Sequence, residues 1–330
     1  LRCDIGKGAV MSSWSIAQAN LTSVGVLTFI FGFLAARIKS DVRVPDAIYA
    51  FLSTYLLFGI GLKGGHSLKT SSLSELATPA LTTIACGILI PLLAFFTLKL
   101  IKVLNDVDRG SIAAHYGSTS LVTFSAGLLF LESNNIFVEG YAPALLTLLE
   151  IPGLIVGIFL ASRSLTTKVR WSETLKEVLL GKTVLLLAGG LAIGLITSNE
   201  GYMKVSPFFV ELLNGFLVLF LLHLGYLAGS NFSEIRKVGA PLAAFGIFFP
   251  LLSGLIGVTA GSLIGMSVGG ATMLGILAAS ASYIAAPAAV AVALPTASPT
   301  LALMSSIGIT FPFNLILGIP IYYKIAQLFN

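Results

Sequence analysis

The chain has very little charge for its size. Of its 330 residues only 10% are Asp, Glu, Lys or Arg, whereas 56% are hydrophobic, and the mean hydropathy is +0.97. A water-soluble domain carries about 25% charged residues. A chain this apolar needs lipid as its solvent, and membrane-spanning segments must satisfy their backbone hydrogen bonds internally. We therefore expect an all-α polytopic membrane protein.

Cysteine and histidine are equally scarce. Cys3 and Cys86 lie far apart, and no two of the three histidines stand at a metal-ligand spacing. This argues against a disulfide framework or a metal centre, and no glycine-rich segment has the context of a nucleotide loop. No set of nucleophile and base is evident either, so we expect neither an enzyme nor an organic cofactor. The net charge of +5 is scattered over loops, which disfavours a nucleic-acid partner.

Long apolar runs occupy most of the chain. A helix needs about 20 apolar residues to cross a bilayer. Runs bounded by charge, Gly and Pro predict ten crossings, near 20–37, 44–62, 77–101, 110–131, 141–162, 182–198, 207–229, 240–266, 269–294 and 301–325. Residues 1–19 are interpreted as a leader, in which Met11 could be the start of translation, and residues 163–181 as a cytoplasmic linker.

Basic residues divide unevenly between the two sides of this predicted membrane protein. Loops after odd-numbered crossings hold thirteen of the nineteen Lys and Arg residues. Because Lys and Arg accumulate in cytoplasmic loops, both termini should face outward, in an inner (plasma) membrane.

The two halves of the chain share a pattern. Gly61-Leu-Lys-Gly-Gly65 recurs as Gly225-Tyr-Leu-Ala-Gly229, Ser118-Thr-Ser120 as Ser280-Ala-Ser282, and Glu150-Ile-Pro152 as Thr310-Phe-Pro312. All three recur in the same order and at nearly the same offset along the chain. This indicates a duplication, with a first repeat over 20–162 and a second over 182–330. Each repeat has five crossings, so the second must be inverted, as in secondary transporters.

The fourth and ninth crossings carry hydroxyl side chains beside helix-weakening residues. We expect both helices to be broken there, within Gly117–Thr123 and Ser280–Pro287. A broken helix exposes N–H groups that can bind an anion, and carbonyls that can bind sodium together with Ser and Thr oxygens. The alternative is that the small residues only allow close helix packing.

One acid lies inside an otherwise uncharged crossing. Glu150 is nine residues into the run 141–162, where an unpaired carboxylate costs at least about 2.5 kcal/mol. It is a cation ligand, a proton carrier or a structural carboxyl beside Pro152. Asn314 offers a polar group near the matching depth of the second half.

At these residues the chain resembles the sodium-dependent bicarbonate transporter family, from Val44 to Leu328. The matching pieces are Val44-Pro-Asp-Ala-Ile48, Gly61-Leu-Lys-Gly-Gly65, Gly117 with Ser120 and Thr123, Leu131-Glu-Ser133, Glu150-Ile-Pro152, Glu234-Ile-Arg-Lys-Val238, Ala278-Ala-Ser-Ala-Ser282, Pro287 and Pro295-Thr-Ala-Ser-Pro299. The resemblance implies ten helices in two inverted five-helix repeats, with core and gate subdomains, and a homotrimer. It also implies sodium-coupled uptake of a small anion held between the half-helices, near Ser120, Thr123, Ser280 and Ser282.

The chain departs from the family pattern at several positions. Leu121-Val122 stands where the family has Gly-Ser, Tyr283 where it has Asp, and Ala291 where it has Arg. The loss of an Asp and of at least two hydroxyls weakens cation coordination and hydrogen bonding to a small oxyanion, so the anion need not be bicarbonate. The short linker gives a cytoplasmic regulatory protein, which docks on family members, little to bind.

The leading hypothesis is therefore a secondary active transporter that takes up a small anion with sodium by alternating access. A cation/proton antiporter that uses Glu150, or a transport-inactive membrane sensor, are the alternatives. The predicted substrate site comprises Gly117, Ser118, Thr119, Ser120, Thr123, Ser280, Ser282 and Tyr283; the predicted ion site comprises Ser120, Thr123, Glu150, Ser282 and Asn314.

Overall fold

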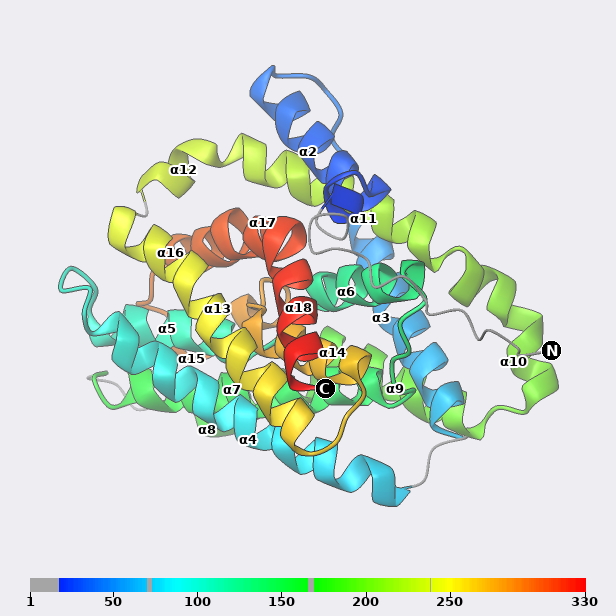
Figure 1. The fold of residues 1–330 in the computed structure, drawn as a ribbon. Coiled ribbons are helices and arrows are strands. Elements are labelled where there is room, and N and C mark those ends of the chain that lie inside the picture. Colours follow the sequence, from blue (N-terminus) through cyan, green and yellow to red (C-terminus); the bar gives the residue numbers. More distant parts are fainter. Residues whose placement is uncertain (1–17, 70–72, 166–168, 238) are drawn as a thin grey trace.

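The computed structural model describes residues 18–69, 73–165, 169–237 and 239–330, and these ranges are helical, with connecting loops and no β-strand (Figure 1). Most of the expected leader, 1–19, lies outside the described residues. The all-helical part of the sequence prediction is confirmed.

The helices follow one another with short connections. In chain order they are α2 (Val24–Arg37), α3 (Asp46–Leu68), α4 (Leu73–Leu98), α5 (Asp106–Gly117), α6 (Leu121–Ser133), α7 (Ala142–Ser162), α8 (Trp171–Leu180), α9 (Lys182–Ile196), α10 (Asn199–Ser206), η1 (Pro207–Glu211), α11 (Leu213–Ser230), α12 (Phe232–Lys237), α13 (Ala240–Leu263), α14 (Val268–Ala279), α15 (Ala285–Ala293), α16 (Pro299–Ser305), η2 (Ser306–Thr310), α17 (Phe311–Phe313), η3 (Asn314–Gly318) and α18 (Ile319–Phe329). The η segments are π-helical turns.

Six continuous helical runs are long and apolar enough to cross a membrane. They are Asp46–Leu68, Ser74–Leu98, Ala142–Ser162, Asn199–Ser230, Ala240–Leu263 and Pro299–Phe329. The pair α8 and α9, bent by 45°, makes a seventh if it is counted as one span. Within the described ranges the other expected crossings have no continuous helix of that length. Helix α2 has 14 residues, and the runs 110–131 and 269–294 are each divided into two shorter helices.

Two helix pairs join distant parts of the chain through glycine. Helix α2 packs along α11, and α3 packs along α9 (Figure 1). A Cβ added at Gly65 would lie 2.1 Å from the Leu191 carbonyl oxygen, and one at Gly225 would lie 2.0 Å from that of Phe29. The duplicated glycine motif therefore serves the same purpose in both halves, because only glycine lets these backbones approach so closely.

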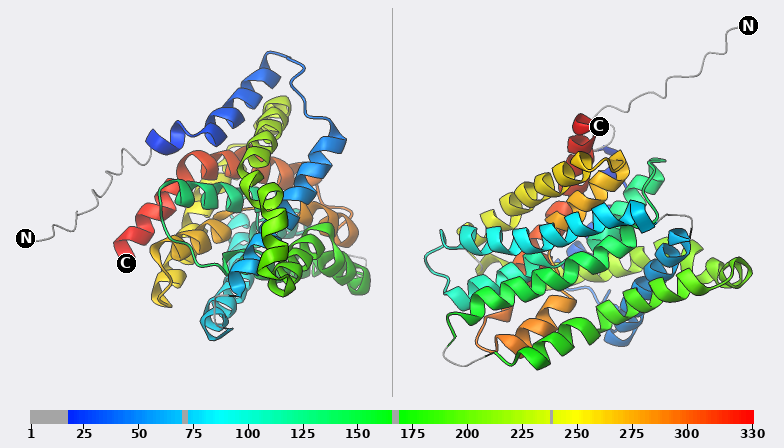
Figure 2. Two further views of the ribbon diagram at one scale, coloured as in Figure 1. Left: turned by 90° about the vertical axis from the view of Figure 1, so that its right-hand side faces the viewer. Right: turned by 90° about the horizontal axis from the view of Figure 1, so that it is seen from below.

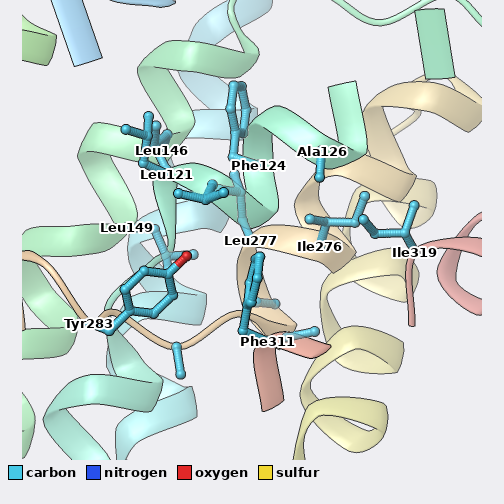
Figure 3. Close-up of a cluster of buried hydrophobic side chains, with 14 of the residues drawn as sticks. Leu121, Phe124, Ala126, Leu146, Leu149, Ile276, Leu277, Tyr283, Phe311 and Ile319 are labelled. Atoms are coloured by element: carbon cyan, nitrogen blue, oxygen red, sulfur yellow. The ribbon is translucent and has the colours of Figure 1, made fainter. Parts of the chain in front are cut away.

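The remaining long helices form two further groups. Helix α7 packs against α4 and α5, and α13 packs against α14 and α18; α15 lies beside α8 (Figure 2). Apolar side chains from both groups meet at a common core, where the rings of Tyr283 and Phe311 pack edge to face with their centroids 5.7 Å apart. Figure 3 shows Leu121, Leu277 and Phe311 of this core around Tyr283. The core surrounds the interruptions in the two divided runs.

Candidate functional site

The two divided runs are interrupted at the serine-rich segments. Helix α5 ends at Gly117 and α6 begins at Leu121, while α14 ends at Ala279 and α15 begins at Ala285. The residue that follows the first helix is extended in both cases, with φ −90° and ψ 177° at Ser118 and φ −83° and ψ 163° at Ser280. Both expected helix breaks are therefore present.

Close packing holds the first interruption in position. A Cβ added at Gly153 of α7 would lie 1.8 Å from the Gly117 carbonyl oxygen, and one at Gly117 would lie 2.7 Å from Pro91 of α4. Any larger residue at Gly117 or Gly153 would push α5 away from its neighbours. Gly117 thus positions the site by packing.

Hydrogen bonds connect the two interruptions directly. The Ser120 N–H donates to Ser280 Oγ at 2.9 Å, and the Ser282 N–H donates to the His115 carbonyl oxygen at 2.7 Å. Two of the N–H groups expected to face a ligand are therefore already bonded to the opposite half of the chain. The interruptions form one structural unit.

Ser120 and Ser282 also have matching roles in the helices that follow them. Ser120 Oγ accepts the Thr123 N–H as the N-cap of α6, and Ser282 Oγ accepts the Ala286 N–H, each at 3.2 Å. Ser282 is the counterpart of Ser120 in the sequence repeat. Each serine therefore accepts an N–H from the half-helix that follows its interruption.

A small pocket lies where the interruptions meet α7 and α9; we call it the central pocket. It has a volume of about 10 Å³ and is lined by Thr119, Ser120, Leu121, Glu150, Thr183, Ser282, Tyr283, Ile284 and Ala285. That volume holds about one water-sized species. Besides Tyr283, the polar residues of the lining are Ser, Thr and Glu, and they come from both interruptions, α7 and α9.

Glu150 is the only acidic residue that the described part of the chain contributes to the lining of the central pocket. Its side chain is 1% exposed, and Oε1 has no hydrogen-bond partner among the described residues. Within the same ranges Thr119 Oγ1 is also buried without a partner. A buried carboxyl oxygen and a buried hydroxyl that lack partners among the described residues are suited to a hard cation, which prefers oxygen ligands. Conventional metal clusters are absent from the described residues, which contain no group of three or more His, Cys, Asp or Glu that could hold a metal ion.

The structure brings only part of the predicted site to the central pocket. Thr119, Ser120, Glu150, Ser282 and Tyr283 line it. The other predicted residues do not line it: Gly117, Ser118, Thr123, Ser280 and Asn314.

Asn314 is engaged elsewhere. Its Nδ2 donates to the Ala279 carbonyl oxygen at 2.8 Å, and its Oδ1 accepts the Tyr322 hydroxyl at 2.8 Å. Both ends of the amide are thus used to hold the C-terminal end of α14 against η3 and α18. In this conformation Asn314 stabilises the end of α14 at the second interruption.

Thr183 is a lining residue that the sequence analysis did not identify. It is the second residue of α9, and it is buried against the central pocket. Its sequence context, Gly181-Lys182-Thr183, indicates only the start of a helix. Nothing in the repeat pattern marks it, because its role arises from the packing of α9 against the interruptions.

A comparison with known protein families gives a match over nearly the whole chain. The family model described as the Na+-dependent bicarbonate transporter superfamily matches residues 25–327, which include every helix that contributes to the central pocket. No curated protein matches the chain.

Proposed function

Because the chain belongs to the Na+-dependent bicarbonate transporter superfamily, we propose that it is a secondary active transporter that takes up a small anion, such as bicarbonate, together with sodium. The family consists of transporters rather than enzymes. The continuous apolar helices fit a membrane protein. The single observation that carries the sodium coupling is the central pocket, where Glu150, whose Oε1 has no partner among the described residues, lies among hydroxyl side chains.

We propose ten crossings in two inverted five-helix repeats. In this scheme α2, α3, α9 and α11 form the gate, and the other long helices form the core. The pairings of α2 with α11 and of α3 with α9 support it, since each pair takes one helix from each half.

Two contacts at the ends of the divided runs also support the inverted repeat. Asp108 Oδ1, in the first turn of α5, accepts the Ser298 N–H at 2.7 Å. Glu139 Oε1 accepts the N–H of Ser267, the N-cap of α14, also at 2.7 Å. In both cases the beginning of one divided run is tied to the loop that follows the other. This exchange is what a twofold axis in the membrane plane would produce.

The size of the central pocket suggests an order of events. A space of about 10 Å³ suits a single ion, whereas a polyatomic anion needs more room. The gate helix α9 closes one side of the pocket with Thr183. We therefore propose that the anion binds when the gate and core have moved apart, and that sodium, coordinated by Glu150, Ser120 and Ser282, favours the closed arrangement.

The distribution of basic residues supports an orientation with both termini outside, in a plasma membrane. A homotrimer and a cytoplasmic regulatory partner stay predictions of the family resemblance. The central pocket does not depend on either, because all of its lining comes from one chain.

Uptake into proteoliposomes tests the proposal. Purified protein is reconstituted, and radiolabelled bicarbonate and a panel of other small monovalent anions are offered with and without an inward sodium gradient. We expect at least one anion to accumulate only with the gradient. Accumulation that is indifferent to sodium would refute the coupling.

The buried position of Glu150 also favours a second candidate, a cation/proton antiporter. Glu150→Gln separates the two functions. An antiporter should lose all cation exchange, whereas an anion symporter should keep measurable anion binding and lose its sodium dependence. If neither sodium nor any anion raises the melting temperature of the wild-type protein, the transport-inactive sensor becomes the better interpretation.

A further inference from the structure

A second cavity lies directly beside the central pocket. It has a volume of about 130 Å³ and is enclosed by α7, the bend between α8 and α9, and α15. Thr183, Ile284 and Ala285 line both spaces, so these three residues form the partition between them.

Charged groups stand at the α8–α9 side of this cavity. Glu177 and Lys182 both line it, and Lys182 Nζ donates to the Ala50 carbonyl oxygen at 3.1 Å. The segment before Lys182 is the charged linker that the distribution of Lys and Arg assigns to the cytoplasmic side. A lining that includes two charged side chains favours the entrance of water and ions into the cavity.

Another cavity, beside α6, η3 and α2, has an arrangement similar to that of the cavity beside Thr183. A cavity of about 350 Å³ is lined by Ala126 of α6, Leu315 of η3 and the beginning of α2. At the offset of 162 that relates Ser118 to Ser280, Ala126 matches Ala288, and Ala288 lines the cavity beside Thr183. Both cavities thus lie between a half-helix, the last crossing of a repeat and the first helix of the other repeat. In an inverted repeat they open on opposite sides of the membrane.

We infer that the cavity beside Thr183 is the cytoplasmic vestibule of the transport path, and that Thr183 is the residue past which sodium and the anion move between the vestibule and the central pocket. This inference rests on the proposed function for its cargo. The inference that water reaches Thr183 through the vestibule does not depend on the proposed function.

Thiol labelling tests the path without requiring transport. Thr183→Cys is placed in a Cys3→Ser, Cys86→Ala background, and a small charged methanethiosulfonate is added to inside-out or right-side-out membrane vesicles. We expect labelling from the cytoplasmic side, since a thiol reacts only where water supports its thiolate. Ala288→Trp, which fills the vestibule, should slow this labelling at least about tenfold.

Ala291→Trp is the matched control for Ala288→Trp. Ala291 lies on the same helix but lines a different cavity, which does not include Thr183. The Ala291→Trp substitution should leave the labelling rate of Thr183→Cys within about twofold of the parent rate. Ala288→Leu provides a smaller obstruction with an intermediate effect if the tryptophan variant does not reach the membrane.

Two results would overturn the vestibule: equal labelling rates in the Ala288→Trp and Ala291→Trp variants, or labelling of Thr183→Cys from the outside alone. Sodium-dependent uptake is then measured on the same two tryptophan variants with Thr183 intact. Loss of uptake in Ala288→Trp alone supports the path. If even the parent protein shows no sodium-dependent uptake, the proposed function fails while the labelling result still decides whether this cavity leads to Thr183.

Discussion

Ser120 connects three parts of the site. Its backbone N–H is bonded to Ser280, its side chain caps α6 through Thr123, and it lines the central pocket. Removing the hydroxyl therefore affects both the stability of α6 and the chemistry of the pocket. The backbone bond to Ser280 survives the substitution, so the two interruptions should remain joined.

We expect Ser120→Ala to lower the free energy of unfolding by about 1 kcal/mol, the usual cost of losing an N-cap, and to reduce sodium-dependent uptake as well. Ser198→Ala is the matched control, because Ser198 caps α10 through the Gly201 N–H and lies outside the central pocket. It should show the same loss of stability in thermal unfolding with normal uptake. Equal uptake by both variants would argue against a role of the Ser120 hydroxyl in transport.

Asp106 makes stability depend on pH at the start of α5. A hydrogen bond from the Arg109 guanidinium, at 2.6 Å, lowers the pKa of Asp106 below its ordinary value. A carboxylate with a lowered pKa stabilises the fold above its unfolded pKa of about 3.9, and this contribution is lost as pH falls through the folded pKa. Because the group is partly exposed, the effect is small.

The melting temperature of the wild-type protein should accordingly fall more steeply than that of Asp106→Asn as the pH decreases below about 4. Arg109→Gln should remove the same pH dependence, and the double variant should remove no more than either single variant. Parallel melting curves for wild type and Asp106→Asn across this pH range would contradict the assignment.

The sequence identified site residues only where the chemistry of a side chain is unusual for its position in an apolar run. Glu150 stood out because a carboxylate is costly inside an apolar run, and it lines the central pocket. Thr183 gave no such signal, since a threonine at the start of a helix is ordinary. Asn314 did stand out by its depth, but depth alone could not indicate that its amide is bonded to Ala279 and Tyr322.

At the scale of helices, the contact of α3 with α9 depends on glycine. Gly65→Ala should lower the free energy of unfolding by about 1–3 kcal/mol, the usual cost of overpacking, because the new Cβ would lie 2.1 Å from the Leu191 carbonyl oxygen. Gly189→Ala is the control on α9, where an added Cβ meets nothing within 4 Å. It should be neutral or stabilising by up to about 1 kcal/mol, measured by thermal unfolding in detergent. The reverse order of stabilities would show that this contact is not what holds the pair together.

Helix breaks were predictable from the sequence, whereas continuous lengths were not. The Ser-x-Ser pattern that recurs in both halves indicated interruptions in two runs, and α5 and α14 end there. The apolar run at 20–37 suggested a full crossing, yet α2 begins only at Val24, because Ser23 caps it. Apolar composition defines how much of a chain prefers lipid, but caps and hydrogen bonds decide where a helix starts.

At the scale of the whole molecule, one ion pair spans the proposed gate and core. Lys63 Nζ of α3 and Glu132 Oε1 of α6 lie 2.6 Å apart, and both side chains are partly exposed. Such a pair contributes at most about 1 kcal/mol to stability. The position of the pair is more informative than its energy, because a movement of the gate relative to the core would separate Lys63 from Glu132.

Cross-linking Lys63→Cys to Glu132→Cys with a short bifunctional thiosulfonate should therefore abolish uptake, and a reductant should restore it. Glu200→Cys with Lys204→Cys is the control, since that ion pair lies within the single helix α10. Its cross-link should leave uptake unchanged. Full uptake by the cross-linked Lys63 and Glu132 variant would exclude movement between these two helices during transport.

The glycine contacts have a consequence for the origin of the protein. Helices α2 and α3 both find their close glycine partners in the C-terminal part of the chain, on α11 and α9. Under the proposed inverted repeat, a five-helix ancestor translated alone would have exposed these surfaces to lipid until it met a copy inserted in the opposite orientation. Two separately expressed fragments, divided before α8, should for the same reason accumulate only when the cell makes both.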